Sequence, residues 1–147
     1  NCYGVWESGY TSTEADPRGI EADGNLDGIY PDHLRQSDFV VENMTIVNNA
    51  ANTTDNVDRM QDVIKIRRGA KATITNALVK GSGGTIDLID MNDNKGTGNA
   101  ASSISITHTL NFKNKLNGTL NTFTEPTTNT GADASLFTWS GYNFSSL

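Results

Sequence analysis

The sequence has one cysteine, Cys2, and only three prolines in 147 residues. A single cysteine excludes an internal disulfide, and in a secreted protein it is typical of a free thiol or of a bond to another chain. Charged residues make up only 19% of the sequence, and the net charge of −6 disfavours binding to nucleic acid. No apolar run reaches the length of a membrane span, and no signal-peptide pattern is visible.

Helical periodicity is nearly absent, and small polar residues take the place of charged ones. The sequence contains 17 asparagines and 18 threonines. Threonine fits strands and asparagine fits bends, whereas both disfavour the interior of a helix. Apolar residues alternate with polar ones in short runs, which is the pattern of strands. The runs cover residues 19–22, 39–47, 63–66, 72–79, 85–91 and 104–112. The sequence therefore predicts an all-β, turn-rich fold.

The strand-like runs repeat along the chain. Residues 39–47 align with residues 72–80 and then with residues 105–110, so that Asn43, Asn76 and His108 correspond at steps of 33 and 32 residues. An earlier strand precedes each of these runs, with Ile20, Ile64 and Ile86 in equivalent positions. The 22 residues from Ile64 to Ile86 match one coil of a β-solenoid.

A stacked solenoid explains why asparagine recurs at the bend. A residue at the corner of a coil adopts a left-handed or bridging conformation, which asparagine tolerates better than most residues. Its amide can then bond to the asparagine of the next coil, about 4.8 Å away. We therefore expect a structural ladder of Asn43, Asn76 and His108. The alternative is that asparagine follows strands by chance in an asparagine-rich chain.

Several segments resemble a family of bacterial right-handed parallel β-helix surface proteins. The segment RGIEADGN at residues 18–25 resembles the RGIEADN motif of that family. Residues 41–47 and 64–79 resemble its N-x-T-I-V and I-x-x-R-x-G…I-x-N-x-x-V motifs, and residues 131–142 resemble its closing segment. Two departures are Ala72 in place of a usual glycine and Tyr142 in place of a usual tryptophan. The resemblance implies the fold and a location at the cell surface, but no particular reaction.

Together the repeats and the resemblance predict an all-β, right-handed parallel β-helix of about three coils. The resemblance implies that these coils form the C-terminal part of a longer helix, because family members carry further coils on the N-terminal side. We expect residues 1–17 to form an N-terminal cap or lead-in, residues 18–114 to form the coils, and residues 115–147 to form a C-terminal loop and cap. Aromatic residues gather at both ends of the sequence, where they are expected to close the solenoid.

One loop has the spacing of a calcium ligand set. Asp23, Asn25 and Asp27 supply side-chain oxygens at alternate positions before Gly28, as at the start of an EF-hand loop. The twelfth position of such a loop would be a glutamate, but here it is Leu34. Calcium bound by Asp23, Asn25 and Asp27 is one interpretation, and a polar surface turn is the other. No other cofactor is expected.

The basic residues gather at Lys65, Arg67 and Arg68. Parallel β-helix polysaccharide lyases use basic groups on such a face to neutralise a uronate and to remove a proton, with the help of calcium. These three residues are therefore a candidate glycan-binding site. The alternative is a solvated face paired with Glu42 or Asp62. No catalytic residue is assigned, because neither His33 nor His108 has an evident nucleophile as partner.

The leading hypothesis is a non-catalytic module of an extracellular or bacterial cell-surface protein, structural or adhesive, which binds glycan or protein. The expected partners are missing upstream β-helix coils or further copies of the chain, stacked end to end in self-assembly. The alternative hypothesis is a fragment of a polysaccharide lyase or hydrolase that acts on acidic glycan. A groove with paired carboxylates, or a calcium ion beside a basic group, would favour the enzyme.

Overall fold

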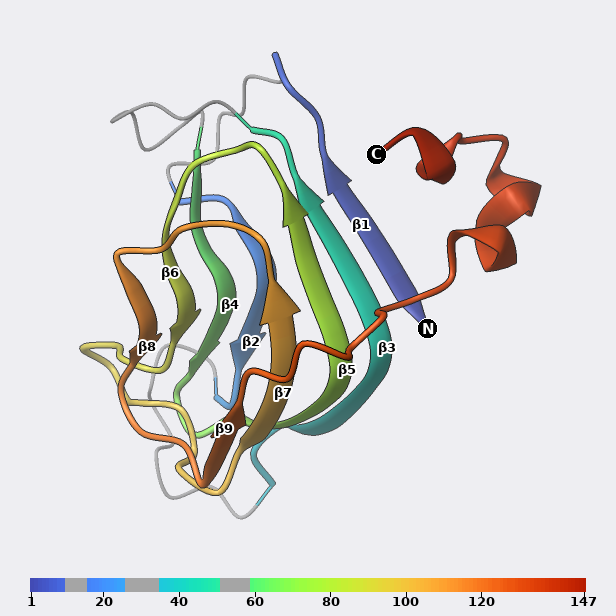
Figure 1. The fold of residues 1–147 in the computed structure, drawn as a ribbon. Coiled ribbons are helices and arrows are strands. Elements are labelled where there is room, and N and C mark those ends of the chain that lie inside the picture. Colours follow the sequence, from blue (N-terminus) through green and yellow to red (C-terminus); the bar gives the residue numbers. More distant parts are fainter. Residues whose placement is uncertain (10–15, 26–34, 51–58) are drawn as a thin grey trace.

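A computed structural model describes residues 1–9, 16–25, 35–50 and 59–147. The chain winds into a right-handed parallel β-helix with two sheets (Figure 1). One sheet contains β1 (Cys2–Trp6), β3 (Asp38–Asn48), β5 (Lys71–Gly81), β7 (Ser103–His108) and β9 (Thr122–Thr124), in that order. The other contains β2 (Arg18–Asp23), β4 (Met60–Arg67), β6 (Thr85–Asp90) and β8 (Asn114–Asn117). Two short 3-10 helices follow, η1 (Ala134–Ser140) and η2 (Phe144–Ser146).

The predicted parallel β-helix is confirmed, but its coils extend further than the sequence indicated. Every strand pair is parallel, and the described residues form four successive strand pairs followed by β9. The segment expected to be an N-terminal lead-in contains β1, which pairs with the second half of β3. The segment expected to be a C-terminal cap contains most of β8 and all of β9. The coils predicted for residues 18–114 therefore leave out strands that belong to the β-helix at both ends.

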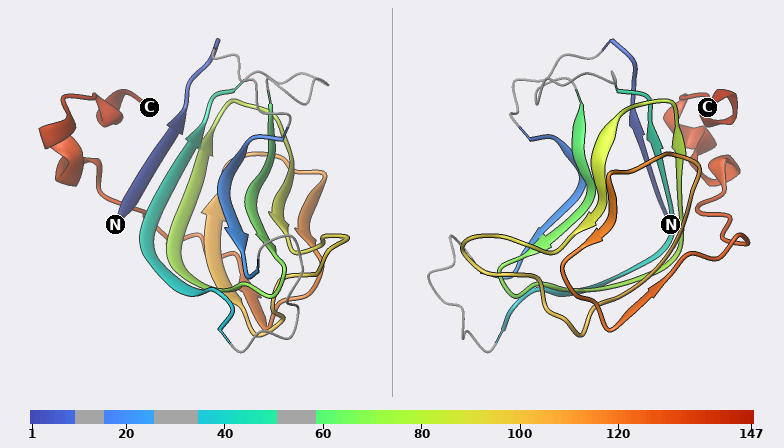
Figure 2. Two further views of the ribbon diagram at one scale, coloured as in Figure 1. Left: turned by 180° about the vertical axis from the view of Figure 1, so that it is seen from behind. Right: turned by 60° about the vertical axis from the view of Figure 1, so that its left-hand side comes forward.

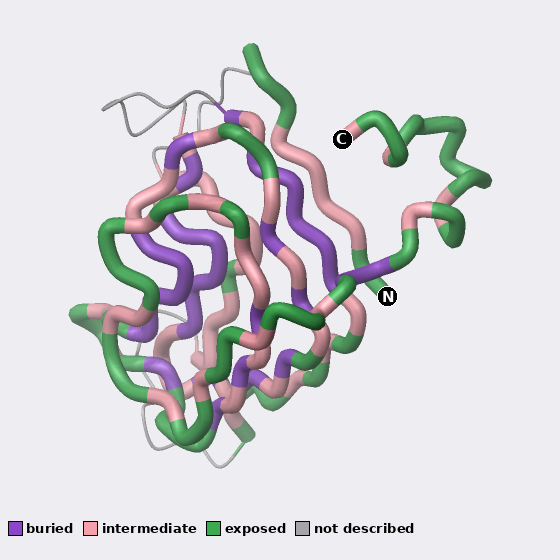
Figure 3. The backbone as a smooth tube through the Cα atoms, viewed as in Figure 1, coloured by how far each residue is buried: buried purple, intermediate pink, exposed green. Residues whose placement is uncertain are grey.

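The core lies between the two sheets and is built from apolar residues of every middle strand. Of the residues that the alternation places in the core, Ile64, Ile66, Ile74, Leu88 and Ile106 are buried. The alignment of Ile86 with Ile64 is wrong, because Ile64 pairs with Ile89. Figure 3 shows that burial is concentrated in the middle strands, while the C-terminal tail is mostly exposed.

Asparagine forms part of the expected ladder. Asn43 and Asn76 have positive φ angles of 57° and 50°, and the Asn76 side-chain Nδ2 donates to Asn43 Oδ1 at 2.7 Å. The ladder prediction is wrong at His108, which pairs with Val79 because β7 has a shift in register between Ile74 and Ala77 of β5. The backbone N–H of Thr130 donates to Asn76 Oδ1 at 2.8 Å, so the C-terminal tail takes the place of a third asparagine.

The tail that follows β9 runs back along the outside of the first sheet, from the last coil to the first (Figure 2). Thr45 of β3 anchors it, because the Thr45 hydroxyl accepts the N–H of Ala132 at 2.9 Å and donates to the Ala132 carbonyl at 3.2 Å. Its end packs on β1, where the rings of Tyr3 and Phe144 lie 4.6 Å apart between centroids. The tail therefore ties the two ends of the solenoid together. Among the described residues, no helix is long and apolar enough to cross a membrane.

Candidate functional site

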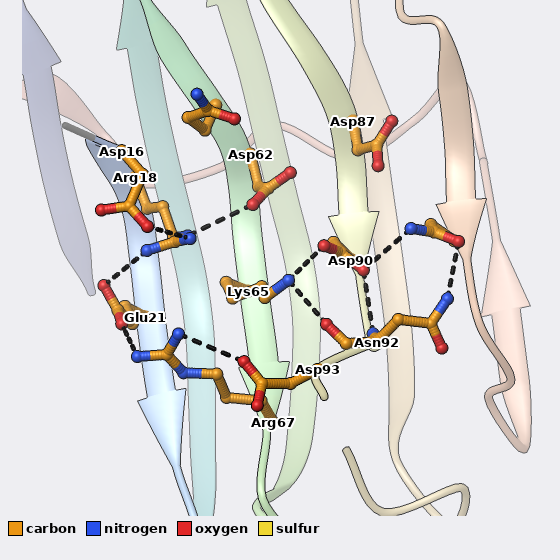
Figure 4. A network of polar contacts seen from close by, with 12 residues as sticks. Asp16, Arg18, Glu21, Asp62, Lys65, Arg67, Asp87, Asp90, Asn92 and Asp93 are labelled. Carbon is orange, nitrogen blue, oxygen red and sulfur yellow. Dashed lines mark hydrogen bonds and ion pairs between the residues drawn. The ribbon is translucent and has the colours of Figure 1, made fainter. Parts of the chain in front are cut away.

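The outer face of the second sheet carries ionic residues in columns that follow the strand register (Figure 4). One column runs through the paired residues Arg18, Asp62, Asp87 and Asn114. A second runs through Glu21, Lys65, Asp90 and Asn117. Because stacked strands lie about 4.8 Å apart, each column brings side chains from four coils within bonding distance. The columns place acidic and basic groups side by side on one face.

In the first column, the two residues at its ends, Arg18 and Asn114, each bond to the aspartate of the neighbouring strand. Arg18 Nε donates to Asp62 Oδ2 at 3.2 Å, and the same guanidinium bonds Asp16 at 2.7 Å and Glu21 at 3.0 Å. At the other end, Asn114 Nδ2 donates to Asp87 Oδ1 at 2.7 Å. Asp62 and Asp87 are both buried. Burial of two neighbouring carboxylates is costly unless each is compensated by such partners.

The second column is built around Lys65, which is 7% exposed. Its ammonium forms an ion pair with Asp90 and donates to the carbonyl of Asn92 at 2.7 Å. Asp90 Oδ1 also accepts from Asn117 Nδ2 at 3.1 Å. Since a lysine is seldom buried unless it is paired, these bonds account for its position. They also direct its ammonium toward the protein and away from solvent.

The two arginines at the end of β4 are likewise held by carboxylates. Arg67 forms ion pairs with Glu21 and Asp23, with its Nε 2.5 Å from Asp23 Oδ1. Arg68 donates from Nη1 to Asp23 Oδ2 at 3.1 Å. Asp93, from the loop after β6, lies 3.5 Å from Arg67 Nη1. The three basic residues of the predicted ligand site are thus brought together, each already bonded to a carboxylate.

The pKa values on this face shift in opposite directions. Burial, together with the charge of Asp90, raises the pKa of the Asp62 carboxyl above its ordinary value. Burial also acts to raise the pKa of Asp93, but the N–H of Lys95 and the charges of Arg67 and Arg68 outweigh it and lower that pKa. Burial is thus the main cause of the shift at Asp62, whereas hydrogen bonding and neighbouring cations stabilise the charged form of Asp93.

Among the described residues, Asp62, Asp87 and Asp90 form a group on this face that could hold a metal ion. Each offers one carboxylate oxygen, and these three oxygens lie within 4.8 Å of one another. Carboxylate oxygens suit a hard cation such as calcium. An ion here would compete with Lys65 for Asp90 and with Arg18 for Asp62. Sequence reasoning missed this cluster because it depends on Asp62 pairing with Asp87, a register of 25 residues and not 22.

The loop predicted to bind calcium is described only in part. Asp23 is placed at the end of β2, where both of its carboxylate oxygens accept hydrogen bonds from Arg67 or Arg68. Two residues further along the chain, the side-chain amide of Asn25 is buried, and Asp27 lies outside the described residues. The carboxylate of Asp23 is therefore already paired with arginine, so a calcium ion would have to compete with Arg67 and Arg68 for it.

The two histidines do not extend this site. His33 lies outside the described residues. His108 Nε2 lies 2.7 Å from Glu125 Oε1, and its Nδ1 lies 2.9 Å from the carbonyl oxygen of Leu110. Glu125 also pairs with Lys115, and that hydrogen bond, followed by the one to His108, lowers the pKa of the Glu125 carboxyl. These contacts join the end of β7 and Lys115 of β8 to the residue that follows β9, and none of the three residues belongs to the two ionic columns.

Comparison with known proteins identifies the family of the chain. Residues 3–142 match the pectate-lyase-like beta helix domain. No curated protein matches the chain significantly, and no solved structure does so either. The match covers β1 from its second residue and all of β2 to β9, so it includes two strands, β1 and β9, that lie outside the coils predicted from the sequence. The chain therefore belongs to the family of pectate-lyase-like β-helix domains.

Proposed function

We propose that the chain is a non-catalytic β-helix module of an extracellular or cell-surface protein, with a structural or adhesive role. The observation that carries this proposal is that Lys65, Arg67 and Arg68 are each ion-paired with carboxylates of neighbouring coils. The extracellular location is supported by the resemblance of residues 18–25 to bacterial surface proteins.

The ion pairs bear on catalysis because elimination from a uronate needs two groups that are available to the substrate. One is a cation that neutralises the uronate carboxylate, and the other is a base that removes the neighbouring proton. Here the ammonium and guanidinium groups already bond to protein carboxylates. In the part of the chain that the structure describes, the face also carries more acidic than basic side chains. Its acidic members are Asp16, Glu21, Asp23, Asp62, Asp87, Asp90 and Asp93, against Arg18, Lys65, Arg67 and Arg68.

An excess of carboxylates repels an acidic polysaccharide unless metal ions bridge the two. The network is better suited to stability. It links β2, β4, β6 and the loop after β6 by charge-assisted bonds, several of them partly buried. A face of this kind holds successive coils in register, which is what a structural module requires.

A fragment of a polysaccharide lyase is the second candidate, and the cluster of Asp62, Asp87 and Asp90 favours it. A cation bound there would sit beside Arg18 and Lys65 on the outer face of a sheet, a suitable place for an acidic sugar. Binding of the cation would also weaken the hold of Asp90 on Lys65. The structural module and the lyase fragment therefore differ in one property. In the lyase, calcium would free Lys65 from Asp90, whereas in the structural module Lys65 stays paired.

The test is to incubate the protein with polygalacturonate and with alginate, each with calcium and with chelator. We expect no unsaturated uronate product under any of these conditions. The variants Arg67→Ala and Asp87→Asn serve as matched controls on the two halves of the face. Product that forms only with calcium, and that is lost in both variants, would replace the structural proposal with the lyase.

A further inference from the structure

Lys65 and Asp90 are directly paired residues of the neighbouring parallel strands β4 and β6. Their side chains form an ion pair on the outer face of the second sheet, where they are 9% and 11% exposed. Figure 4 shows the Lys65 ammonium directed at the Asp90 carboxylate and at the Asn92 carbonyl, which accepts from it at 2.7 Å. The strand register and a second acceptor therefore hold the amine against the carboxylate.

The other oxygen of the Asp90 carboxylate, Oδ1, accepts from two N–H donors. The backbone N–H of Asn92 donates to it at 2.9 Å, and Asn117 Nδ2 donates to it at 3.1 Å. Lys65 contacts Oδ2 instead. Two N–H donors at such distances are the arrangement that stabilises the oxyanion formed during acyl transfer. The carboxyl carbon of Asp90 therefore has an amine beside one oxygen and an oxyanion-stabilising pair beside the other.

We propose that Lys65 and Asp90 condense into an intramolecular amide, which joins β4 covalently to β6. The Lys65 ammonium first passes a proton to Asp90 Oδ2 along the existing contact. Burial favours this step, because a neutral pair needs less solvation than two charges. The lone pair of Nζ then attacks Cγ, and the negative charge develops on Oδ1 between its two donors. The bond between Cγ and Oδ2 breaks, and Oδ2 leaves as water with two protons that came from Nζ.

The condensation needs no co-reactant, because an ammonium and a carboxylate contain the same atoms as an amide and one water. The second proton needs a carrier between Nζ and Oδ2. Asp62 and Asp87 each place one carboxylate oxygen within 4.8 Å of a carboxylate oxygen of Asp90, so either can relay that proton. The product keeps one N–H on Nζ, which can continue to donate to the Asn92 carbonyl.

A second lysine–aspartate pair in the same type of register provides a comparison. Asp38 of β3 pairs directly with Lys71 of β5, and Lys71 Nζ lies 3.1 Å from Asp38 Oδ2. The Lys71 and Asp38 side chains are 36% and 58% exposed, so water solvates both charges. We expect no amide at this pair. Burial, and not proximity alone, distinguishes Lys65 and Asp90.

The amide goes beyond the structural role proposed above and does not depend on it. It would close a loop between two residues that are 25 positions apart, as a disulfide does in other chains. The single cysteine of this chain excludes an internal disulfide. Salt weakens an ion pair but leaves an amide intact. An amide would also fix Lys65 permanently, so that calcium could not release it from Asp90.

Mass spectrometry of the denatured 147-residue chain tests the amide directly. We expect the intact mass to fall short of the sequence mass by one water molecule. Trypsin does not cleave after an acylated lysine, so the digest should contain a branched peptide in which residues 60–67 are joined to residues 81–95. Fragmentation should place the branch between Lys65 and Asp90. In the same digest, cleavage after Lys71 should be normal, which serves as the internal control.

Lys65→Arg is the matched variant, because arginine keeps a positive charge for Asp90 while its guanidinium stays protonated and does not attack Cγ. Its mass should equal the sequence mass, and its digest should contain no branched peptide. A loss of water that persists in Lys65→Arg would come from dehydration at another residue and would overturn the proposal.

The wild-type digest decides the question even if the variant fails to fold. Full recovery of residues 60–65 and 81–95 as separate peptides, together with an intact mass equal to the sequence mass, would show that Lys65 and Asp90 remain an ion pair. That result would overturn the amide and leave the structural role standing. Lyase activity is measured separately, so the failure of one proposal can be told from the failure of the other.

Discussion

Asn76 stacks on Asn43 at the corner of successive coils, and its Nδ2 donates to Asn43 Oδ1 at 2.7 Å. Both residues have left-handed backbone conformations, which most side chains disfavour. Asn76 Oδ1 also accepts the N–H of Thr130, so one side chain bonds both the preceding coil and the tail. The corner thus requires a residue that accepts a positive φ angle and that carries an amide to bond its neighbours. Mutation can separate these two requirements.

Asn76→Ala removes the amide and leaves alanine at a positive φ angle, so both effects should destabilise the protein. We expect a loss of about 1–3 kcal/mol in the free energy of unfolding. Asn76→Gly removes the amide but accepts the left-handed conformation, and its loss should be smaller. Denaturant titration of the two variants measures both effects. Equal losses would show that the φ angle of 50° contributes nothing.

Ile74 should be sensitive to substitution because it is 1% exposed in the middle of β5. We expect Ile74→Ala to cost about 2–5 kcal/mol through the cavity that it leaves. Ile74→Asp would bury an unpaired charge and should abolish the fold. The neighbouring residue Thr75 is exposed, so Thr75→Asp is the matched control and should change stability little. Circular dichroism during thermal unfolding would contradict the register if Ile74→Asp melted like the wild type.

Asp62, in the first column of the second sheet, predicts a dependence of stability on pH. Because burial and Asp90 raise the pKa of Asp62 in the folded state, its contribution to stability is present below the ordinary aspartate pKa. It is lost as the pH rises through the folded-state pKa. Asp62→Asn should therefore be more favourable to stability at pH 7 than at pH 3, while it keeps an acceptor for Arg18.

Asp93 serves as the control of opposite sign. Its pKa is lowered, so its contribution is present above the ordinary aspartate pKa and is lost as the pH falls through the folded-state value. Asp93→Asn should therefore destabilise the protein at pH 7 and change little at acidic pH. Urea unfolding of both variants at several pH values measures these trends. The same pH trend in both variants would contradict the assignment of their environments.

The sequence predicted the fold where strand and corner repeat without interruption, as in β3 and β5 with Asn43 and Asn76. It failed at β7, where the register shifts between Ile74 and Ala77 and moves His108 out of the ladder. It also missed β1, because five residues with a glycine at their centre carry little alternation. A shift of this kind changes no local propensity, so it is visible only when the strands are paired.

The sequence predicted the basic residues of the candidate site but not the carboxylates that pair with them. Lys65, Arg67 and Arg68 are neighbours in the sequence and stand out as a group. Their partners are distant, since Asp90 is 25 residues from Lys65 and Asp23 is 44 residues from Arg67. Only the pairing of β2, β4 and β6 brings these groups together. The length of each coil decides which distant residues become neighbours. A site in a solenoid can therefore be predicted from charged residues only where the coil lengths are known.

The chain offers two sets of oxygen ligands for calcium. One is the loop of Asp23, Asn25 and Asp27, in which Asp23 already accepts from two arginines. The other is the cluster of Asp62, Asp87 and Asp90, in which Arg18 and Lys65 compete for two of the carboxylates. Because a cation must displace these partners, we expect millimolar calcium to leave the melting temperature unchanged relative to chelator.

Calorimetry checks this expectation, since an ion at 100 times its dissociation constant would stabilise the fold by about 2.7 kcal/mol. Two variants show which of the two ligand sets is responsible for any stabilisation by calcium. Asp87→Asn removes one carboxylate of the cluster but leaves Arg18 and Lys65 with their partners, whereas Asp27→Asn alters only the loop. A rise in melting temperature that Asp87→Asn abolishes would place calcium beside Lys65 and strengthen the case for a lyase. A rise that only Asp27→Asn abolishes would instead assign calcium a structural role next to β2, because Asp23 and Asn25 lie at the end of that strand.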